Sequence, residues 1–354
     1  MGRRPDTAPL LDLVRRFLRD GSHARRLRRE LRALGNPTRV VDLLEAERPR
    51  WAALGKLLAH ERGEVRLAAA ALFLVVLPPT GEHFLHARVR GVDRALARAL
   101  GDASPAVRRV ALTLISHATR GVSARLLDAL DDRDPEARRA ALDAVARLRP
   151  RGAIARLRPL LQDEQPAVRR AAASALGRLG ARTAVPRLIA MTRDRDAGCA
   201  SAAISALGAI GDARAFDALR ARIGRGREGA ALALGMLGDP RALDVLTRLA
   251  RDEGSSAKLQ REAVAGLMHL ADPRSRALLI SLIDDPQRVR FVRMQAARAL
   301  ARIDDAPSRE FLRECLAEGG ERGYDVARGL STYGGEWSAE ANDVVSRYEG
   351  WDAD

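Results

Sequence analysis

Three pairs of adjacent arginines are the residues whose type and spacing point most directly to chemistry. They are Arg108–Arg109, Arg138–Arg139 and Arg169–Arg170, which recur after 30 and 31 residues. The guanidinium group presents a planar fork of N–H donors that matches a carboxylate or a phosphate. These pairs are therefore expected to hold acidic groups, either within the chain or on a partner.

The two members of each pair are expected to have different roles. The first arginines can reach aspartates of the turns, in their own or a neighbouring repeat, and form a structural ladder of Asp102, Arg108, Asp132, Arg138, Asp163 and Arg169. The second arginines share a polar helix face with residues such as Thr113, Asp143 and Ser174. We expect them to line a concave surface as a basic binding stripe of Arg109, Arg139 and Arg170. A solvated charged face is the alternative, and the series lapses at Ser201, Glu228, Arg261, Met294 and Tyr324.

Other chemical candidates are sparse. His83 and His86 stand three residues apart in an insertion at residues 77–91, but a zinc site needs a third or fourth ligand. Two surface histidines on a tolerated loop are the alternative. Six histidines, two cysteines and 12 aromatic residues leave little for nucleophilic or metal chemistry. The sequence thus predicts no catalytic residues, no metal, no cofactor and no enzymatic activity.

An internal repeat positions the arginine pairs. Each pair is followed by an apolar residue seven positions after its first arginine, and this landmark continues along the chain at Phe73, Ile115, Val145, Leu176, Leu207, Leu234, Leu267, Leu300 and Leu330. The intervals of 27 to 42 residues predict about nine units of two short helices over residues 54–334. Proline precedes the arginine pairs as a first helical residue, and Asp134 is expected to cap its helix. Residues 1–53 are expected to form a basic helical cap and residues 335–354 an acidic tail or cap.

The charge distribution indicates an acidic partner. The chain carries 61 Lys and Arg against 46 Asp and Glu, a net charge of +15. Residues 1–50 hold 13 Arg against seven acids, whereas residues 309–354 hold five Arg against 11 acids. The apolar run at 67–79 is too short to span a bilayer, so no membrane insertion and a cytoplasmic location are expected. An acidic protein or peptide is the favoured partner, with nucleic acid as the alternative.

The pattern D-x-x-P-x-V-R-R-x-A occurs at 102–111 and 163–172, and nearly at 132–141. It resembles the short bacterial HEAT repeats, a type also found in phycobilin lyases. The resemblance implies an all-α fold, a right-handed α-solenoid with a concave surface. It favours a non-catalytic interaction scaffold.

Two other functions are weighed beside the scaffold. One is a nucleic-acid-binding protein similar to alkylpurine DNA glycosylases, which the charge supports and the scarcity of aromatic residues opposes. The other is a chromophore lyase, by resemblance to the lyase repeats alone.

Overall fold

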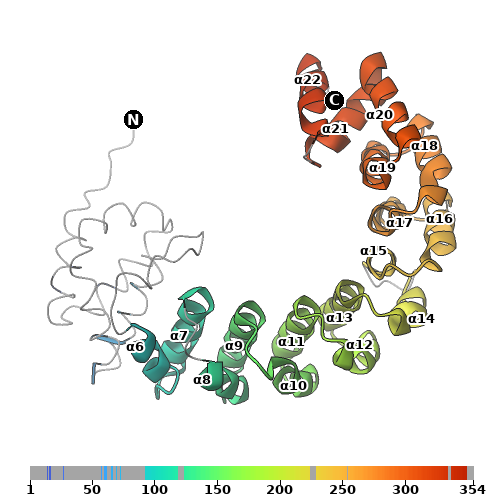
Figure 1. Ribbon diagram of the computed structural model, residues 1–354. Coiled ribbons are helices and arrows are strands. Elements are labelled where there is room, and N and C mark those ends of the chain that lie inside the picture. The colour runs from blue at the N-terminus through green and yellow to red at the C-terminus, as the bar shows by residue number, and fades with distance from the viewer. Residues whose placement is uncertain are drawn as a thin grey trace. The chain divides into compact units, whose positions relative to one another are not determined.

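The computed structural model describes residues 92–118, 123–223, 229–252, 254–333 and 336–348, together with isolated residues between 14 and 72. Every regular element in these ranges is a helix, and the chain is an all-α solenoid (Figure 1). Most of the predicted N-terminal cap, and the predicted insertion with His83 and His86, lie outside the described residues.

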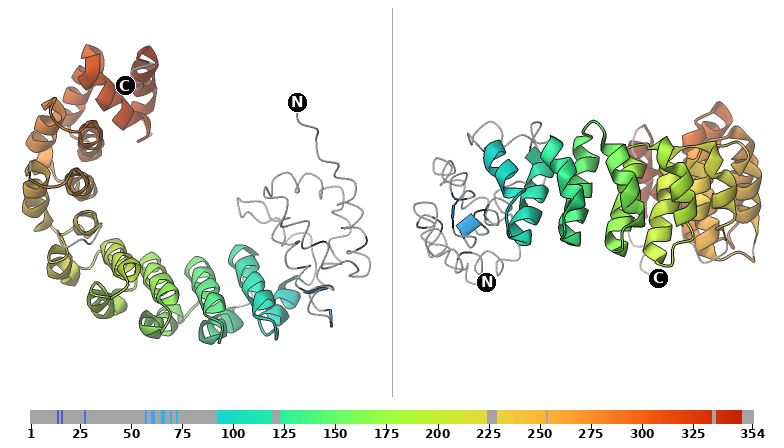
Figure 2. Two further views of the ribbon diagram at one scale, coloured as in Figure 1. Left: turned by 180° about the vertical axis from the view of Figure 1, so that it is seen from behind. Right: turned by 90° about the horizontal axis from the view of Figure 1, so that it is seen from below.

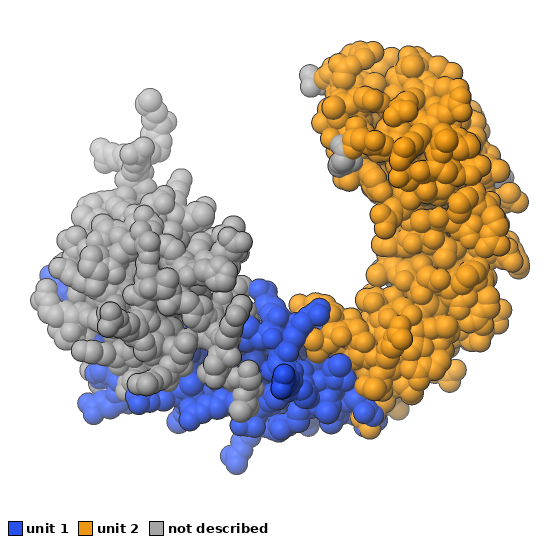
Figure 3. Space-filling model, viewed as in Figure 1, with its two compact units in different colours: residues 1–175 blue, residues 176–354 orange. Residues whose placement is uncertain are grey.

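Two compact units divide the chain, residues 1–175 and residues 176–354 (Figure 3). In the described part of unit 1, three long helices form one layer and shorter helices form the other (Figures 1 and 2). The long helices are α7 (Pro105–Ala118), α9 (Pro135–Leu148) and α11 (Pro166–Arg178), the last of which continues into unit 2. The shorter elements are α6 (Val92–Ala99), α8 (Ser123–Asp128), η2 (Ala129–Asp131), α10 (Ala153–Leu157) and η3 (Arg158–Gln162).

Unit 2 repeats the same two layers. One layer holds α13 (Ala197–Ile210), α15 (Ala230–Met236), α17 (Ala257–Leu270), α19 (Arg290–Ile303) and α21 (Gly320–Ser331). The other holds η4 (Arg182–Ala184), α12 (Val185–Met191), η5 (Ala213–Ala215), α14 (Phe216–Arg220), α16 (Ala242–Arg251), η6 (Pro273–Ser275), α18 (Arg276–Asp284) and α20 (Ala306–Glu318). Within this unit, α15, α17 and α19 lie on the inner side of the curve and α16 and α18 on the outer side (Figure 1). We call the first layer of each unit the long-helix layer and the second the short-helix layer.

The apolar landmarks of the repeat form the core. Their exposed fractions are 0 to 1 % at Ile115, Val145, Leu176, Leu207, Leu234, Leu267, Leu300 and Leu330. Buried alanines surround them, such as Ala141 and Ala172 in unit 1. Each helix pair covers its apolar face by stacking on the next pair, and stability is distributed along the stack. The prediction that a two-helix repeat organises the chain is confirmed for these units, while Phe73 lies outside the described residues.

Glycine lets neighbouring long helices of unit 2 touch through their backbones. A Cβ at Gly235 of α15 would lie 2.2 Å from the carbonyl oxygen of Gly266 in α17. A Cβ at Gly208 of α13 would lie 2.9 Å from the Cα of Ala233 in α15. Both contacts are shorter than any real Cβ makes, so a larger residue at either glycine would push the helices apart.

The last helix of the chain packs on the final repeat. α22 (Trp337–Arg347) lies against α21 and buries Trp337, which is 3 % exposed. The Tyr348 hydroxyl accepts a hydrogen bond from the Gly320 N–H at 3.0 Å, and its ring meets Tyr324 edge-on. The described part of residues 335–354 therefore contacts the solenoid.

Candidate interaction site

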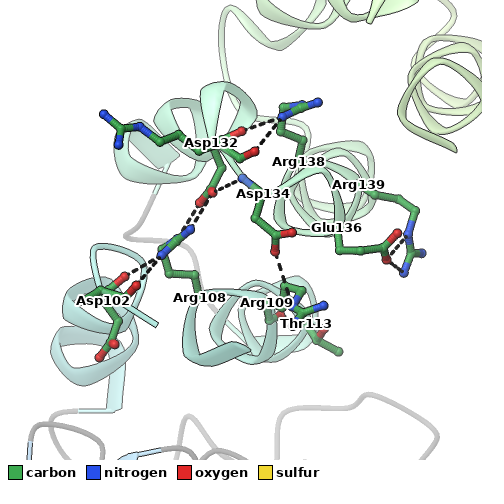
Figure 4. Close-up of polar contacts among 11 residues, drawn as sticks. Asp102, Arg108, Arg109, Thr113, Asp132, Asp134, Glu136, Arg138 and Arg139 are labelled. Atoms are coloured by element: carbon green, nitrogen blue, oxygen red, sulfur yellow. Dashed lines mark hydrogen bonds and ion pairs between the residues drawn. The ribbon is translucent and has the colours of Figure 1, made fainter. Parts of the chain in front are cut away.

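The first arginine of each pair joins one repeat to the next. Arg108 Nε and Nη2 donate to the two carboxylate oxygens of Asp132, both at 2.7 Å (Figure 4). Arg138 holds Asp163 in the same way, at 2.8 and 2.9 Å. In both pairs the carboxylate belongs to the following repeat, about 25 residues along the chain.

The same guanidinium groups also close their own turns. Arg108 Nη1 donates to the carbonyl oxygen of Asp102 at 2.8 Å, and Arg138 Nη1 donates to that of Asp132 at 2.8 Å. Arg169 makes the corresponding bond to the carbonyl oxygen of Asp163 at 2.9 Å. The predicted ladder residues are thus brought together, with the side chain of each aspartate in one repeat and its arginine partner in the repeat before.

The turn aspartates also order the start of each long helix. Asp102, Asp132 and Asp163 each accept the N–H of the residue two positions on, at 2.8 to 2.9 Å. Asp134 is the N-cap residue of α9, but its side chain makes no capping hydrogen bond. Asp134 thus holds the predicted N-cap position without the capping hydrogen bond, and its Oδ2 lies 3.4 Å from Arg109 Nε instead.

The burial of the ladder determines its electrostatics. The exposed fractions of the two side chains are 16 % for Arg108 and 8 % for Asp132. Burial raises the pKa of Asp132, but the hydrogen bonds from Arg108 and the Asp134 N–H outweigh it and hold the pKa below the ordinary value. The carboxylate is therefore ionised at neutral pH and remains paired.

Sequence reasoning missed one rung of this ladder. Arg66 pairs with Asp102 and donates Nη1 to the carbonyl oxygens of His60 and Glu61, so it copies the geometry of Arg108. The signal was present, because Arg66 stands seven residues before the landmark Phe73.

The second arginines lie on the exposed side of the long-helix layer, but two of them have acidic neighbours. Arg109 Nε lies 3.4 Å from Asp134 Oδ2, and Arg139 Nη2 lies 2.8 Å from Glu136 Oε2. Both arginine side chains are 44 % exposed. Arg170 is exposed, and its guanidinium has no ion pair among the described residues.

The ladder position is the residue seven positions before each landmark, and unit 2 has different residues there. Gln260 stands there in α17 and keeps only the turn-closing bond, from its Nε2 to the carbonyl oxygen of Asp252 at 2.7 Å. Arg293 stands there in α19 and pairs with Asp325 of α21, which is 0 % exposed. Arg290 donates to the same carboxylate at 2.6 Å, so two cations hold one buried anion.

A second arginine motif in unit 2 pairs an aspartate with an arginine of the same loop, and Arg214 also donates to the carbonyl oxygen of Arg182 in the loop before, at 3.0 Å. Asp212, Asp239 and Asp272 each accept both the N–H and the guanidinium of the arginine two residues on, namely Arg214, Arg241 and Arg274. Hydrogen bonds from Arg214 lower the pKa of Asp212 to about 2. The sequence signal is an Asp-x-Arg in the loops that follow α13, α15 and α17, and it is absent from the prediction.

Two further features, a cluster of metal ligands and a membrane-spanning helix, were sought among the described residues. Within the described ranges, no three His, Cys, Asp or Glu side chains are grouped as metal ligands. Nor is any helix in those ranges long and apolar enough to cross a membrane.

The arrangement defines a helical-repeat solenoid, and comparison with known proteins gives its family. The family model for HEAT repeats matches residues 123–199, 154–227, 200–256 and 253–330, together more than half of the chain. The chain belongs to the HEAT-repeat family, whose fold is typical of protein-interaction scaffolds. A comparison with curated proteins gave no match.

The chain is also similar to solved structures at low sequence identity. Importin beta is 18 % identical with a TM-score of 0.50, over 96 % of this chain and 54 % of that chain. The CpcE–CpcF complex of phycocyanin lyase from Nostoc is 19 % identical with a TM-score of 0.43, over 68 % of this chain and 94 % of that chain. An engineered protein is 18 % identical with a TM-score of 0.49, over 98 % of this chain and 100 % of that chain.

Proposed function

We propose that the chain is a non-catalytic scaffold that binds an acidic segment of a partner protein along the long-helix layer of unit 1. The binding residues are Arg109, Arg139 and Arg170, one on each of three successive long helices. The observation that carries the proposal is Arg170, an exposed guanidinium without an ion pair among the described residues.

The existing contacts of Arg109 and Arg139 are compatible with this role. Exposed ion pairs contribute only about 0–1 kcal/mol, so a partner carboxylate can replace Asp134 or Glu136 at little cost. Arg108 and Arg138 differ, because their side chains are only 16 % and 11 % exposed and hold the turns. The second arginine of each pair is the one that remains available to a partner.

The test compares two variants with the same change in charge. The first changes Arg109, Arg139 and Arg170 to Glu, and the control changes Arg125, Arg156 and Arg187, which are exposed on the short-helix layer, to Glu. The probe is a fluorescent peptide of alternating Glu and Ser, followed by anisotropy at a fixed salt concentration. We expect the first variant to lose binding by about tenfold or more, and the control to retain it.

A duplex DNA probe separates the alternative function. If DNA binds more tightly than the acidic peptide and both triple variants lose it equally, the chain uses its general charge on nucleic acid. That result, or unchanged peptide binding by the first variant, would overturn the proposed site.

A further inference from the structure

The long-helix layer changes character in unit 2. Apolar side chains stand at its half-exposed positions, and the most open is Phe291, which is 41 % exposed. We define the Met face as Leu232 and Met236 of α15, Met268 of α17, and Phe291 and Met294 of α19. Val289, next to the start of α19, is 53 % exposed. Apolar side chains gathered on a surface mark an interaction site more often than single ones do.

These positions are equivalent to charged and polar ones in unit 1. Met294 stands six residues before its landmark Leu300, as Arg109, Arg139 and Arg170 do before theirs. Leu232 stands two residues before Leu234, where unit 1 has Asp143 or Ser174. The repeat therefore presents the same helix face to solvent in both units, and α15, α17 and α19 of unit 2 place apolar groups there beside Arg261 and Arg298.

Close helix packing makes the Met face continuous. α15 and α17 meet at the backbones of Gly235 and Gly266, where a single Cβ has no room. α17 and α19 also pack side by side, and the Arg261 guanidinium of α17 lies 5.2 Å from the Phe291 ring centre of α19. The cation thus lies directly against the apolar surface, an arrangement stabilised by the electrons of the ring.

Three arginines on this face lack a carboxylate partner among the described residues. Arg261 and Arg302 have no ion pair among the described residues. Arg298 donates to the carbonyl oxygen of Gly329 and to the Thr332 hydroxyl, and it has no carboxylate partner there either. Arg298 is half-buried, and this burial lowers the pKa of its guanidinium. In unit 1, by contrast, Arg109 and Arg139 already have acids beside them.

We propose that the Met face binds an acidic amphipathic helix of a partner protein. Apolar side chains of that helix pack on Leu232, Phe291 and the methionines, and its carboxylates pair with Arg261, Arg298 and Arg302. Flexible methionine side chains adapt to such apolar groups, and helices commonly dock through residues one turn apart. The same face of a second copy does not suit it, because both copies would present arginines without carboxylate partners there. The proposal rests on the proposed scaffold function, but it uses a different surface.

The test uses methionine methyl groups as reporters. The probe is a peptide of about 18 residues, roughly five helical turns, with Leu one turn apart on one side and Glu on the other. Chemical shifts of ¹³C-methyl methionine are followed in the full chain during titration. We expect Met236, Met268 and Met294 to shift, whereas Met191 in α12, which is 6 % exposed, stays unchanged.

Two control peptides identify what is recognised. One replaces every Leu with Ser and keeps the charge, and the other replaces every Glu with Lys and keeps the apolar side. Both should bind at least about tenfold more weakly, since each removes one half of the match. Equal binding by the Ser peptide would overturn the apolar anchor, and equal binding by the Lys peptide would overturn the acidic partner.

Variants separate this surface from the one in unit 1. Changing Met236 and Met294 to Glu should weaken the amphipathic peptide by about tenfold or more, with Met191 and Met268 signals confirming the fold. Changing Arg109, Arg139 and Arg170 to Glu should leave that peptide bound. If only the second variant loses the peptide, the Met face is wrong and the scaffold function stands on unit 1. If the amphipathic peptide binds neither the unchanged chain nor either variant, the Met face proposal fails.

Discussion

The turns at residues 102–163 and the long helices at residues 200–267 join similar helix pairs by different chemistry. In the first region, Arg108 and Arg138 reach across to the aspartates of the next repeat. In the second region, Ala200 and Gln260 stand at the ladder position of α13 and α17, Arg227 at that position before α15 lies outside the described residues, and the backbones meet at Gly235 and Gly266.

The two ways of joining repeats leave different charged side chains exposed on the surface. Where arginines join repeats, acids accompany them and also pair with the exposed arginines, as Asp134 does with Arg109. Where α15 and α17 meet at glycines, Arg261 remains without a carboxylate in the described part of the chain. The surface open to a partner thus follows from how the helices are held together.

The largest expected effect is at the buried ion cluster that ends unit 2. Changing Asp325 to Ala removes the buried carboxylate of Arg293, which is only 4 % exposed, and leaves it only the exposed carboxylate of Glu321 among the described residues. We expect the free energy of unfolding to fall by about 3–5 kcal/mol, measured by urea denaturation. The control is Asp343→Ala, which removes an exposed pair with Arg347 and should cost at most about 1 kcal/mol. Equal losses of unfolding free energy in the two variants would show that burial of this cluster does not contribute to stability.

The next effect is at the glycine contact. Changing Gly235 to Ala forces a methyl group against Gly266, so we expect a loss of about 1–3 kcal/mol despite the better helix propensity of alanine. Gly101→Ala is the matched control, because its new Cβ would lie 3.6 Å from its nearest neighbour, an ordinary contact. Thermal unfolding compares the two. A Gly235→Ala variant as stable as the unchanged chain would mean that the backbone contact does not join these helices.

The pH dependence should reveal the paired carboxylates. The pKa values of Asp102, Asp132 and Asp212 are all lowered in the folded chain, so the unfolded chain binds more protons at acid pH. Stability should be constant above the ordinary carboxyl pKa of about 3.9 and fall as the pH drops toward 2. Urea-unfolding midpoints measured across this pH range give the slope of stability against pH, and Asp132→Asn should reduce that slope. An unchanged slope would contradict the ladder.

The smallest expected effect is at a helix end of unit 2. Ala271 follows α17 with a positive φ of 51°, where the equivalent residues Gly211 and Gly238 are glycines. Changing Ala271 to Gly removes this strain and should stabilise the chain by about 0.5–1 kcal/mol. A small rise in the melting temperature is the expected readout, and a fall would show that the alanine side chain contributes more than its backbone strain costs.

The repeat and its core could be predicted from the sequence because burial imposes a period. Landmarks such as Leu176 and Leu300 recur at one place in each unit, whatever the neighbouring residues are. The acids of the ladder could also be named, since Asp132 and Asp163 occupy a fixed place in the turn. Which repeat supplies the partner depends on the stacking of helices, and the sequence does not show this.

The exposed face was harder to predict. Arg109 and Arg139 were expected to be available, but Asp134 and Glu136 come within reach once the helices form and stack. In the sequence, Met294 only interrupts the arginine series, because a methionine in a helix usually indicates a core position. Its exposure becomes visible only when α15, α17 and α19 are placed beside one another.

The most direct test of the comparison is a pair of double-mutant cycles in the same chain, with Arg and Asp changed to Ala singly and together. One cycle uses Arg108 and Asp132, which join two repeats, and the other uses Arg241 and Asp239, which share one loop with Arg241 56 % exposed. We predict a coupling free energy of about 1–3 kcal/mol for the first pair and below about 0.5 kcal/mol for the second. Equal couplings, or a larger one in the loop, would contradict the conclusion that the Arg108–Asp132 pair joins two repeats of unit 1 whereas the Arg241–Asp239 pair holds a single loop of unit 2.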